Sequence, residues 1–158
     1  MEKILVTGGC GFIGSHLVDR LIQLEYDVVV LDNLSTGKIE NLNPKAELII
    51  GDICDREIVK KACNEIDGCI HLAAVASVQK SIENWLTTHT INQSGTVTLL
   101  EEISKRKTAL TYPFLYASSA AVYGDNANMP LSEKHTAKPR TPYRIDKYAC
   151  EHQARVAH

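Results

Sequence analysis

Short apolar runs alternate with longer amphipathic segments along most of the chain. Five runs are rich in β-branched, aromatic or other large apolar side chains and predict strands at residues 3–7 (KILVT), 27–31 (DVVVL), 47–50 (ELII), 69–72 (CIHL) and 112–117 (YPFLYA). The segments between them have helical patterns and predict helices at residues 12–24, 55–65 and 85–105. Strands that alternate with helices predict βαβ crossovers, and therefore an α/β fold with a mainly parallel sheet and helices on both faces.

The last part of the chain has a different pattern. Residues 124–141 are polar, contain Pro130 and Pro139, and predict a long loop, which in a compact domain is usually functional. A final helix is predicted over residues 142–157, with Thr141 as its N-cap and Pro142 in its first position. No glycine cap, proline or closing strand follows it. We therefore expect one domain over residues 1–158 that is cut before its last elements.

Length and charge limit the classes of function. A chain of 158 residues is long enough for one sizeable core. Its net charge of −2 gives no reason to expect nucleic acid or an anionic membrane as a partner, so a small ligand is the better expectation. No apolar run approaches the ~20 residues that span a bilayer, and the apolar stretch at the N-terminus is too short for a secretory signal. A cytoplasmic location is expected.

The cysteines and histidines give no metal or disulfide pattern. The five cysteines are odd in number and form no CxxC pair. The six histidines form no HExxH motif. The sequence therefore predicts free, mostly buried thiols and no metal site.

Four glycines fall within seven positions, at Gly8, Gly9, Gly11 and Gly14. They follow a predicted strand and open a predicted helix, and they fit both GxGxxG and TGxxGxxG. A tight turn, close approach of the backbone to a pyrophosphate and close helix–strand packing each need bare backbone. Asp32 ends the next strand, where its carboxylate accepts hydrogen bonds from a ribose 2′-hydroxyl and repels a 2′-phosphate. This pattern predicts bound NAD rather than NADP; a plain tight turn with a surface Asp32 is the alternative.

A second group of residues indicates proton transfer. Tyr143 and Lys147 lie four apart on the predicted last helix and therefore share a face. A phenol is a poor base near neutrality, but a nearby ammonium and an oxidised nicotinamide favour the phenolate, which can take a proton from a substrate hydroxyl. Ser118 and Ser119 follow a predicted strand, at the edge where open α/β sheets bind ligands, so either hydroxyl can hold the same oxygen. A solvated helix face is the alternative explanation for the Tyr143–Lys147 spacing.

At this point the chain resembles a known family. TGGCGFIGSH, LDNLSTG, GDI, HLAA, SVQKS, NQSGT, SSAAVYG and PYRIDK occur in that order between residues 7 and 147. Together they resemble the extended short-chain dehydrogenase/reductase (NAD-dependent epimerase/dehydratase) superfamily, and most closely its UDP-glucose 4-epimerase group. The resemblance implies a Rossmann-type, doubly wound parallel sheet. It also implies that this chain is the N-terminal half of such an enzyme, without the C-terminal domain that grips the nucleotide sugar.

The resemblance assigns roles residue by residue. Ser119, rather than Ser118, matches the catalytic serine because it directly precedes AAVYG, and it acts with Tyr143 and Lys147. Tyr143 and Lys147 also hold the nicotinamide ribose. The other residues implied to bind or border NAD are Gly8, Gly11, Phe12, Ile13, Gly14, Asp32, Asn33, Ser35, Thr36, Gly37, Asp52, Ile53, Leu72, Ala73, Ala74, Lys80 and Asn92.

The implied reaction is epimerisation at C4 of a nucleotide sugar, with a UDP-hexose expected. Tyr143 takes the 4-hydroxyl proton while C4 gives hydride to NAD; the 4-ketose turns over and hydride returns to its other face. Dehydratases of the superfamily place an acid where this chain has Ala120 and Ala121, which favours epimerisation. Asp146 stands where a small residue commonly precedes the lysine. Adjacent helix positions point in different directions, so we expect its effect on Lys147 to be modest.

Two alternatives remain from the sequence, and one assembly is implied. The chain could be an inactive, truncated NAD-binding fragment, or a nucleotide-sugar dehydratase or reductase of the same superfamily. Family members often dimerise through the two helices that match residues 85–105 and 143–158. A homodimer is therefore expected for the full protein.

Overall fold

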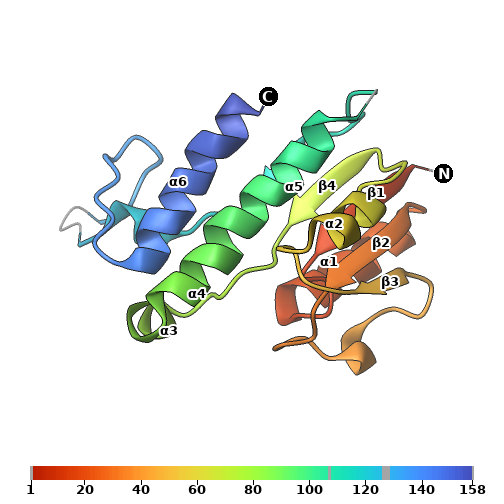
Figure 1. Cartoon of the computed structure of the whole chain (residues 1–158), viewed down its shortest axis with the longest axis horizontal. Coiled ribbons are helices and arrows are strands. Elements are labelled where there is room, and N and C mark those ends of the chain that lie inside the picture. Colours follow the sequence, from red (N-terminus) through yellow and green to blue (C-terminus); the bar gives the residue numbers. More distant parts are fainter. Residues whose placement is uncertain (1, 107, 126–128, 158) are drawn as a thin grey trace.

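The strands form a single parallel sheet. The computed structural model describes residues 2–106, 108–125 and 129–157. The sheet order is β3-β2-β1-β4-β5 (Figure 1). Each predicted strand is present, with ends that lie within two residues of the prediction: β1 (Lys3–Thr7), β2 (Asp27–Asp32), β3 (Glu47–Ile50), β4 (Gly68–His71) and β5 (Phe114–Tyr116).

Helices connect the strands. They are α1 (Phe12–Gln23), α2 (Arg56–Ala62), α3 (Val78–Glu83), α4 (Trp85–His89), α5 (Gly95–Ser104) and α6 (Pro142–Val156). The helix predicted over residues 85–105 is divided into α4 and α5 by a π-helical turn, Thr90–Ser94. Helix α3 was not predicted: it is a short helix that Ser77 caps by accepting a hydrogen bond from the Lys80 amide.

Both faces of the sheet are buried because successive side chains of a strand point to opposite sides. On one face, Leu5 and Leu31 pack in a core cluster with Val59 of α2 and Leu99 of α5. On the other face, the neighbouring strand residues pack around Val18 of α1. This arrangement confirms the expected Rossmann-type parallel sheet with helices on both faces.

The side on which successive strands join the sheet switches at β1, and this switch positions the site. β2 and β3 extend the sheet on one side of β1, whereas β4 and β5 extend it on the other. Open α/β sheets bind ligands outside the carboxyl ends of the strands at such a switch point. Helix α6 contacts α3, α4, α5 and β5, so the predicted catalytic helix lies beyond β4, next to α5 (Figure 1).

The predicted loop over residues 124–141 has only turns and bends in its described parts, 124–125 and 129–141; residues 126–128 lie outside the described residues. No helix within the described ranges is long and apolar enough to cross a membrane. In that same part of the chain, no group of three or more His, Cys, Asp or Glu side chains is placed to hold a metal ion.

All five cysteines are free thiols, and four of them are buried. Burial raises the pKa of the Cys54 and Cys63 thiols to about 12. Burial, and secondly the charge of Asp32, raises the pKa of Cys10 to about 11. Thiols with such pKa values are protonated and unreactive near neutrality.

Candidate cofactor and catalytic site

A cavity of about 140 Å³ lies at the carboxyl ends of the strands, where the switch point predicts a ligand. Most of the residues expected to bind NAD line it: Gly8, Gly11, Asp32, Asn33, Ser35, Thr36, Gly37, Asp52, Ile53, Leu72, Ala73 and Ala74. The structure thus brings together segments that follow four different strands.

The glycines of the first turn are required for different reasons. Gly8 has a φ of +72°, and a Cβ added there would lie 2.8 Å from the Ala73 amide nitrogen. A Cβ on Gly14 would lie 2.2 Å from the Gly8 carbonyl oxygen. Gly11 differs, because its added Cβ would meet only the Gly8 oxygen, at 3.3 Å, and Gly11 lines the cavity. Packing therefore explains Gly8 and Gly14, whereas space for a ligand explains Gly11.

Gly11 is also the N-cap of α1, and no side chain caps that end of the helix. The first amides of a helix lack partners within the helix and favour an anion. Phe12 and Ile13 open the helix with side chains that are 81% and 70% exposed, outside the cavity lining. The backbone amides at the start of α1, rather than the Phe12 and Ile13 side chains, are therefore the groups suited to bind a pyrophosphate.

Replacing Gly11 with alanine tests this division. Gly11→Ala is expected to weaken NAD binding about tenfold while it lowers the melting temperature little, because φ at this position is −77° and suits any residue. Gly8→Ala is the matched comparison, and it is expected to destabilise the fold strongly because φ is positive and the backbone of Ala73 is close. Equal losses of stability in the two variants would contradict this assignment.

Asp32 ends β2 with a largely buried carboxylate. One oxygen, Oδ2, accepts a hydrogen bond from the Cys10 amide at 2.9 Å, and the other, Oδ1, from the Leu34 amide at 2.8 Å. Since a carboxylate offers about four acceptor positions, these bonds orient it and leave capacity for a ribose hydroxyl.

Asn33 joins the ends of β2 and β3. Its amide nitrogen donates to Asp52 Oδ2 at 3.0 Å, and its oxygen accepts from the Ser35 amide at 3.0 Å. Partial burial raises the pKa of Asp52, but hydrogen bonds from the Cys54 amide and the Asn33 side chain prevail and lower it below its usual value. This rim of the cavity is therefore anionic and held in place by hydrogen bonds.

Asn92 and Lys80, both expected near the cofactor, have different positions. Asn92 lies buried in the π-helical turn, where its Oδ1 accepts from the Val75 amide at 2.8 Å and its Nδ2 donates to the Val75 carbonyl at 3.1 Å. It does not line the cavity but holds Val75, which does. Lys80 is exposed on α3 and also lies outside the lining.

Helix α6 buries the side chains of Tyr143, Asp146, Lys147 and Cys150 along one face. The Lys147 ammonium donates to the Ala117 carbonyl at 2.8 Å and lies 4.7 Å from the centre of the Tyr116 ring. Burial lowers the pKa of Lys147 to about 8. The Lys147 cation is thus held against the end of β5, on the same helix face as the Tyr143 phenol.

Asp146 was expected to point away from Lys147. The structure places both on the buried face, but the Asp146 carboxylate pairs with His89 Nδ1 of α4 at 2.8 Å. The carboxylate is therefore directed to α4 and does not pair with the Lys147 ammonium.

The two serines differ in their contacts. Ser118 Oγ donates to the carboxylate of Glu151. Ser119 Oγ accepts from the Ala121 amide at 3.2 Å and so caps the 3-10 turn Ala120–Tyr123. Among the described residues, none accepts the Ser119 hydroxyl proton, which is therefore available to a substrate oxygen.

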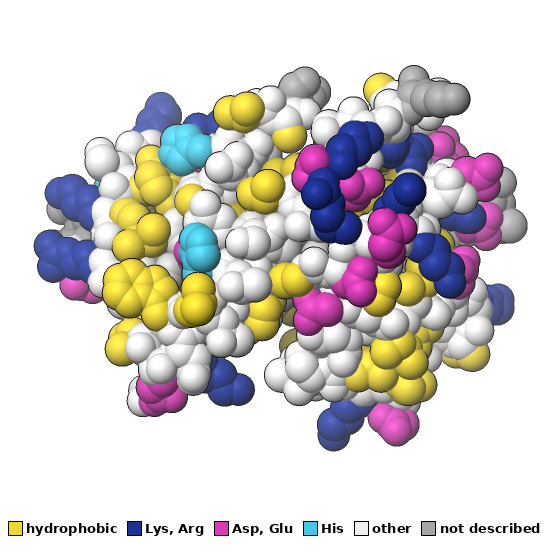
Figure 2. Space-filling model, viewed as in Figure 1, with side chains coloured by type: hydrophobic (Ala, Val, Ile, Leu, Met, Phe, Trp, Pro, Cys, Tyr) yellow, Lys and Arg dark blue, Asp and Glu magenta, His cyan; other side chains and the backbone are white. Residues whose placement is uncertain are grey.

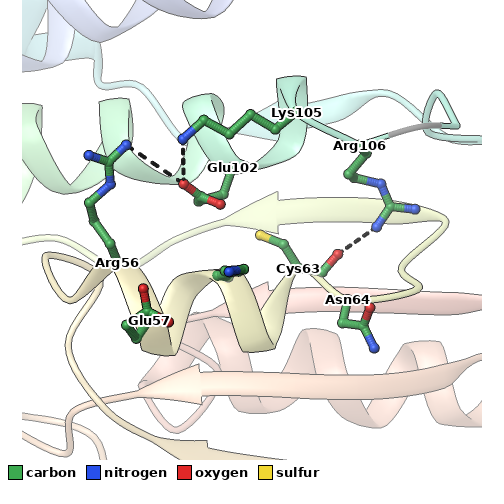
Figure 3. Close-up of a pocket in the computed structure, with 8 residues that line it drawn as sticks. Arg56, Glu57, Cys63, Asn64, Glu102, Lys105 and Arg106 are labelled. Atoms are coloured by element: carbon green, nitrogen blue, oxygen red, sulfur yellow. Dashed lines mark hydrogen bonds and ion pairs between the residues drawn. The ribbon is translucent and has the colours of Figure 1, made fainter.

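A larger hollow, of about 620 Å³, lies on the surface between α2 and the end of α5 (Figure 3). Three of the four cationic side chains that line it have partners: Arg56 pairs with Glu101 at 2.6 Å, Lys105 pairs with Glu102 at 2.8 Å, and Arg106 donates to the Cys63 carbonyl. None of the residues expected at the cofactor or catalytic site lines it. The smaller cavity at the strand ends is the better candidate.

Comparison with known proteins agrees with this geometry. The sequence model of the NAD dependent epimerase/dehydratase family matches residues 4–158. The chain belongs to this family.

Relatives within the NAD dependent epimerase/dehydratase family include UDP-glucose 4-epimerases. The UDP-glucose 4-epimerase of Neisseria meningitidis serogroup B is 39% identical over 162 residues, which is 96% of this chain and 47% of that enzyme. The structure of the Thermotoga maritima UDP-glucose 4-epimerase with UDP-glucose superposes with a TM-score of 0.91 at 38% identity, over 98% of this chain and 50% of that chain. The Thermus thermophilus enzyme complex with NAD gives 0.90 at 36% identity, with the same shares. The chain thus spans about half the length of its relatives.

The cofactor of this epimerase/dehydratase family member is NAD. The residues present fit it, because Gly11 leaves an open cradle at the start of α1 and Asp32 offers oriented acceptors at the end of β2. The sequence did not identify four further residues of the cavity lining: Leu31, Gly51, Val75 and Ile91. All four adjoin predicted site residues in the sequence; Val75 follows Ala74, and Ile91 precedes Asn92.

Proposed function

We propose that the complete gene product is an NAD-dependent nucleotide-sugar 4-epimerase of the UDP-glucose/UDP-galactose type. In this proposal residues 1–158 supply the cofactor site and the proton-transfer residues. Most sugar contacts come from a C-terminal half that corresponds to the part of the relatives not matched by residues 1–158. The observation that carries the proposal is the buried Lys147 ammonium, which lies on the same face of α6 as Tyr143 and donates to the carbonyl of Ala117, two residues before Ser119 in the chain. The relatedness to UDP-glucose 4-epimerases supports the substrate class.

Three residues of the chain have distinct roles in the proposed reaction. Tyr143 accepts the proton of the sugar 4-hydroxyl, and Ser119 donates a hydrogen bond to the same oxygen. Lys147 stabilises the phenolate form through its charge. NAD, when bound, would supply a hydride acceptor and donor for the sugar C4, so that no net oxidation occurs.

Epimerisation is favoured over dehydration by the turn that follows Ser119. Ala120 and Ala121 occupy that turn, and neither can protonate a leaving hydroxyl. A dehydratase needs such an acid, whereas an epimerase does not. A reductase acting on another nucleotide sugar uses the same Tyr143 and Lys147, so the assay must separate the two.

The test is a reaction of the purified complete gene product with UDP-galactose, followed by NMR. We expect UDP-glucose to form without added NAD, to an equilibrium mixture reached from either sugar. Formation of a 4-keto-6-deoxy sugar, or turnover only with added NADH, would replace the proposal with a dehydratase or a reductase. A native mass spectrum of the same sample tests whether NAD stays bound; a protein with no nucleotide and no turnover would support the inactive-fragment alternative.

We also propose that the full protein is a cytoplasmic homodimer. Exposed apolar side chains gather over α3 and α4 on the left of the molecule (Figure 2), where Trp85 and Leu86 are 63% and 78% exposed. Val97 of α5 and Ile145 of α6 add to the exposed apolar surface of neighbouring helices. A monomer in light scattering of the full protein would contradict the dimer. The five free thiols support a reducing compartment.

A further inference from the structure

His71, the last residue of β4, is 1% exposed and has a partner at each ring nitrogen. Its Nδ1 lies 2.6 Å from the Thr7 hydroxyl oxygen, and its Nε2 lies 2.9 Å from that of Thr96. A buried histidine with two hydroxyl partners links three elements: β1, β4 and α5.

The protons of this group can be assigned by counting donors. Thr7 Oγ1 already accepts hydrogen bonds from the Leu72 and Ala73 amides, each at 3.2 Å, so its single proton is donated to His71 Nδ1. Nε2 therefore carries the ring proton and donates it to Thr96, whose own proton goes to the Asn92 carbonyl at 2.6 Å. The Leu72 amide is shared with the Thr7 carbonyl, at 3.1 Å, and each other donor of this group has one acceptor. The imidazole is neutral. Burial, and secondly the charge of Lys147, lowers the pKa of His71 to about 3, in agreement with this assignment.

Together with the backbone of residues 73–75, these hydrogen bonds form a closed ring. From Thr96 the chain of bonds reaches the Asn92 backbone, and the Asn92 side chain holds both the amide and the carbonyl of Val75. At the other end, Thr7 holds the amide of Ala73. Both ends therefore terminate on residues 72–75, all of which line the NAD cavity.

We propose that His71 is a positioning residue that fixes residues 72–75 as a wall of the NAD cavity through this closed ring of hydrogen bonds. The imidazole bridges β1 and α5, and the two threonines transmit its orientation to the backbone that faces the cofactor. The proposal rests on NAD binding at this cavity, and it holds for any sugar that the full protein converts.

The test is Thr96→Val in the complete gene product, with Thr98→Val as the matched control. Both changes replace a hydroxyl on α5 with a methyl group, and both remove a bond to the carbonyl four residues earlier; Thr98 is only partly buried, and its hydroxyl donates to the Ser94 carbonyl and takes no part in the His71 group. Thr96→Val leaves the buried His71 donor unpaired. We expect the dissociation constant for NAD to rise about tenfold in Thr96→Val and to stay within about twofold of wild type in Thr98→Val.

Hydrogen exchange in the cofactor-free protein gives a readout that does not depend on activity. The Ala73 amide reports on the Thr7 end of the ring, and the Val75 amide reports on the Asn92 end. Faster exchange at both amides in Thr96→Val, but not in Thr98→Val, is expected. His71→Asn keeps an acceptor near the position of Nδ1, so it should loosen Val75 more than Ala73.

Wild-type exchange at both amides in Thr96→Val, with unchanged NAD affinity, would overturn the proposal, as would equal effects of Thr98→Val. If the wild-type protein binds no NAD, the function proposed above fails, but the two amides still test the ring. If His71→Asn does not fold, Thr96→Val decides alone.

Discussion

Replacing Lys147 with methionine is expected to abolish turnover and at the same time to stabilise the fold. The Lys147 ammonium is 4% exposed, and burial lowers its pKa from 10.5 to about 8. Each unit of such a shift corresponds to about 1.4 kcal/mol, so folding a charged Lys147 at neutral pH costs about 3 kcal/mol. Methionine fills a similar volume without a charge. After allowance for the lost bond to the Ala117 carbonyl, the free energy of unfolding is expected to rise by about 1–2 kcal/mol.

The stability gain should depend on pH in one direction. The pKa in the folded state is about 8 and the ordinary value is 10.5, so the wild-type protein carries the full cost below pH 8. The cost fades as pH rises from 8 to 10.5, because the folded lysine is then neutral and removing the proton from the unfolded chain becomes less costly as pH approaches 10.5. Urea unfolding at pH 7 and pH 9.5 checks this, with the exposed Lys45→Met as the control. A Lys147→Met protein that is less stable at pH 7, or a difference that grows with pH, would contradict the argument.

The activity of Lys147→Met should fall at least about a thousandfold, because proton transfer by Tyr143 loses its neighbouring cation. Turnover of UDP-galactose by the complete gene product measures this. Loss of activity together with a gain in stability separates a functional charge from a structural one. A variant that loses both would indicate that Lys147 mainly holds β5 and α6 together.

The strands could be predicted because burial on both faces requires apolar residues at consecutive positions. In β2, Val28 and Val30 pack toward α1, whereas Val29 and Leu31 pack toward α2 and α5. A strand covered on both sides therefore reads as an uninterrupted apolar run. The short strand β5 was predicted two residues too early, because Tyr112 is apolar enough to extend the run but packs against Tyr26 outside the ladder.

Two helical features could not be predicted for a physical reason. Helix α3 has six residues, too few for periodicity to be read, and its start depends on one capping serine. The π-helical turn before α5 adds a residue to one helical turn at the place where Asn92 binds Val75. That contact joins residues 17 positions apart, which no local pattern encodes.

The candidate site likewise contains residues that a local pattern predicts and residues that only the fold brings together. Gly8, Gly11 and Asp32 belong to one strand–turn–helix–strand unit, so their spacing alone predicted a cavity that the structure contains. His71 stands as a single polar residue in an apolar strand, and its partners Thr7 and Thr96 come from other elements. Residues that support a site by contacts across the fold were therefore missed, whereas residues that form its motif were found.

Ser119→Ala is expected to lower turnover about a hundredfold, whereas Ser118→Ala should change it less than about threefold. The two hydroxyls are adjacent, but Ser118 donates to Glu151, whereas Ser119 accepts from the Ala121 amide and donates to none of the residues that the structure describes. Only Ser119 can therefore donate to the substrate oxygen without breaking an existing bond.

The stability of each variant separates catalysis from capping. Ser119→Ala also removes the cap of the 3-10 turn, which should cost about 1 kcal/mol, and Ser119→Thr restores both the cap and the donor. We therefore expect Ser119→Thr to recover turnover to within about tenfold of wild type. Measured turnover and urea midpoints of the three variants decide the matter: if Ser118→Ala loses the greater activity, the substrate oxygen lies on the Glu151 side of the strand end, and the assignment of Ser119 is wrong.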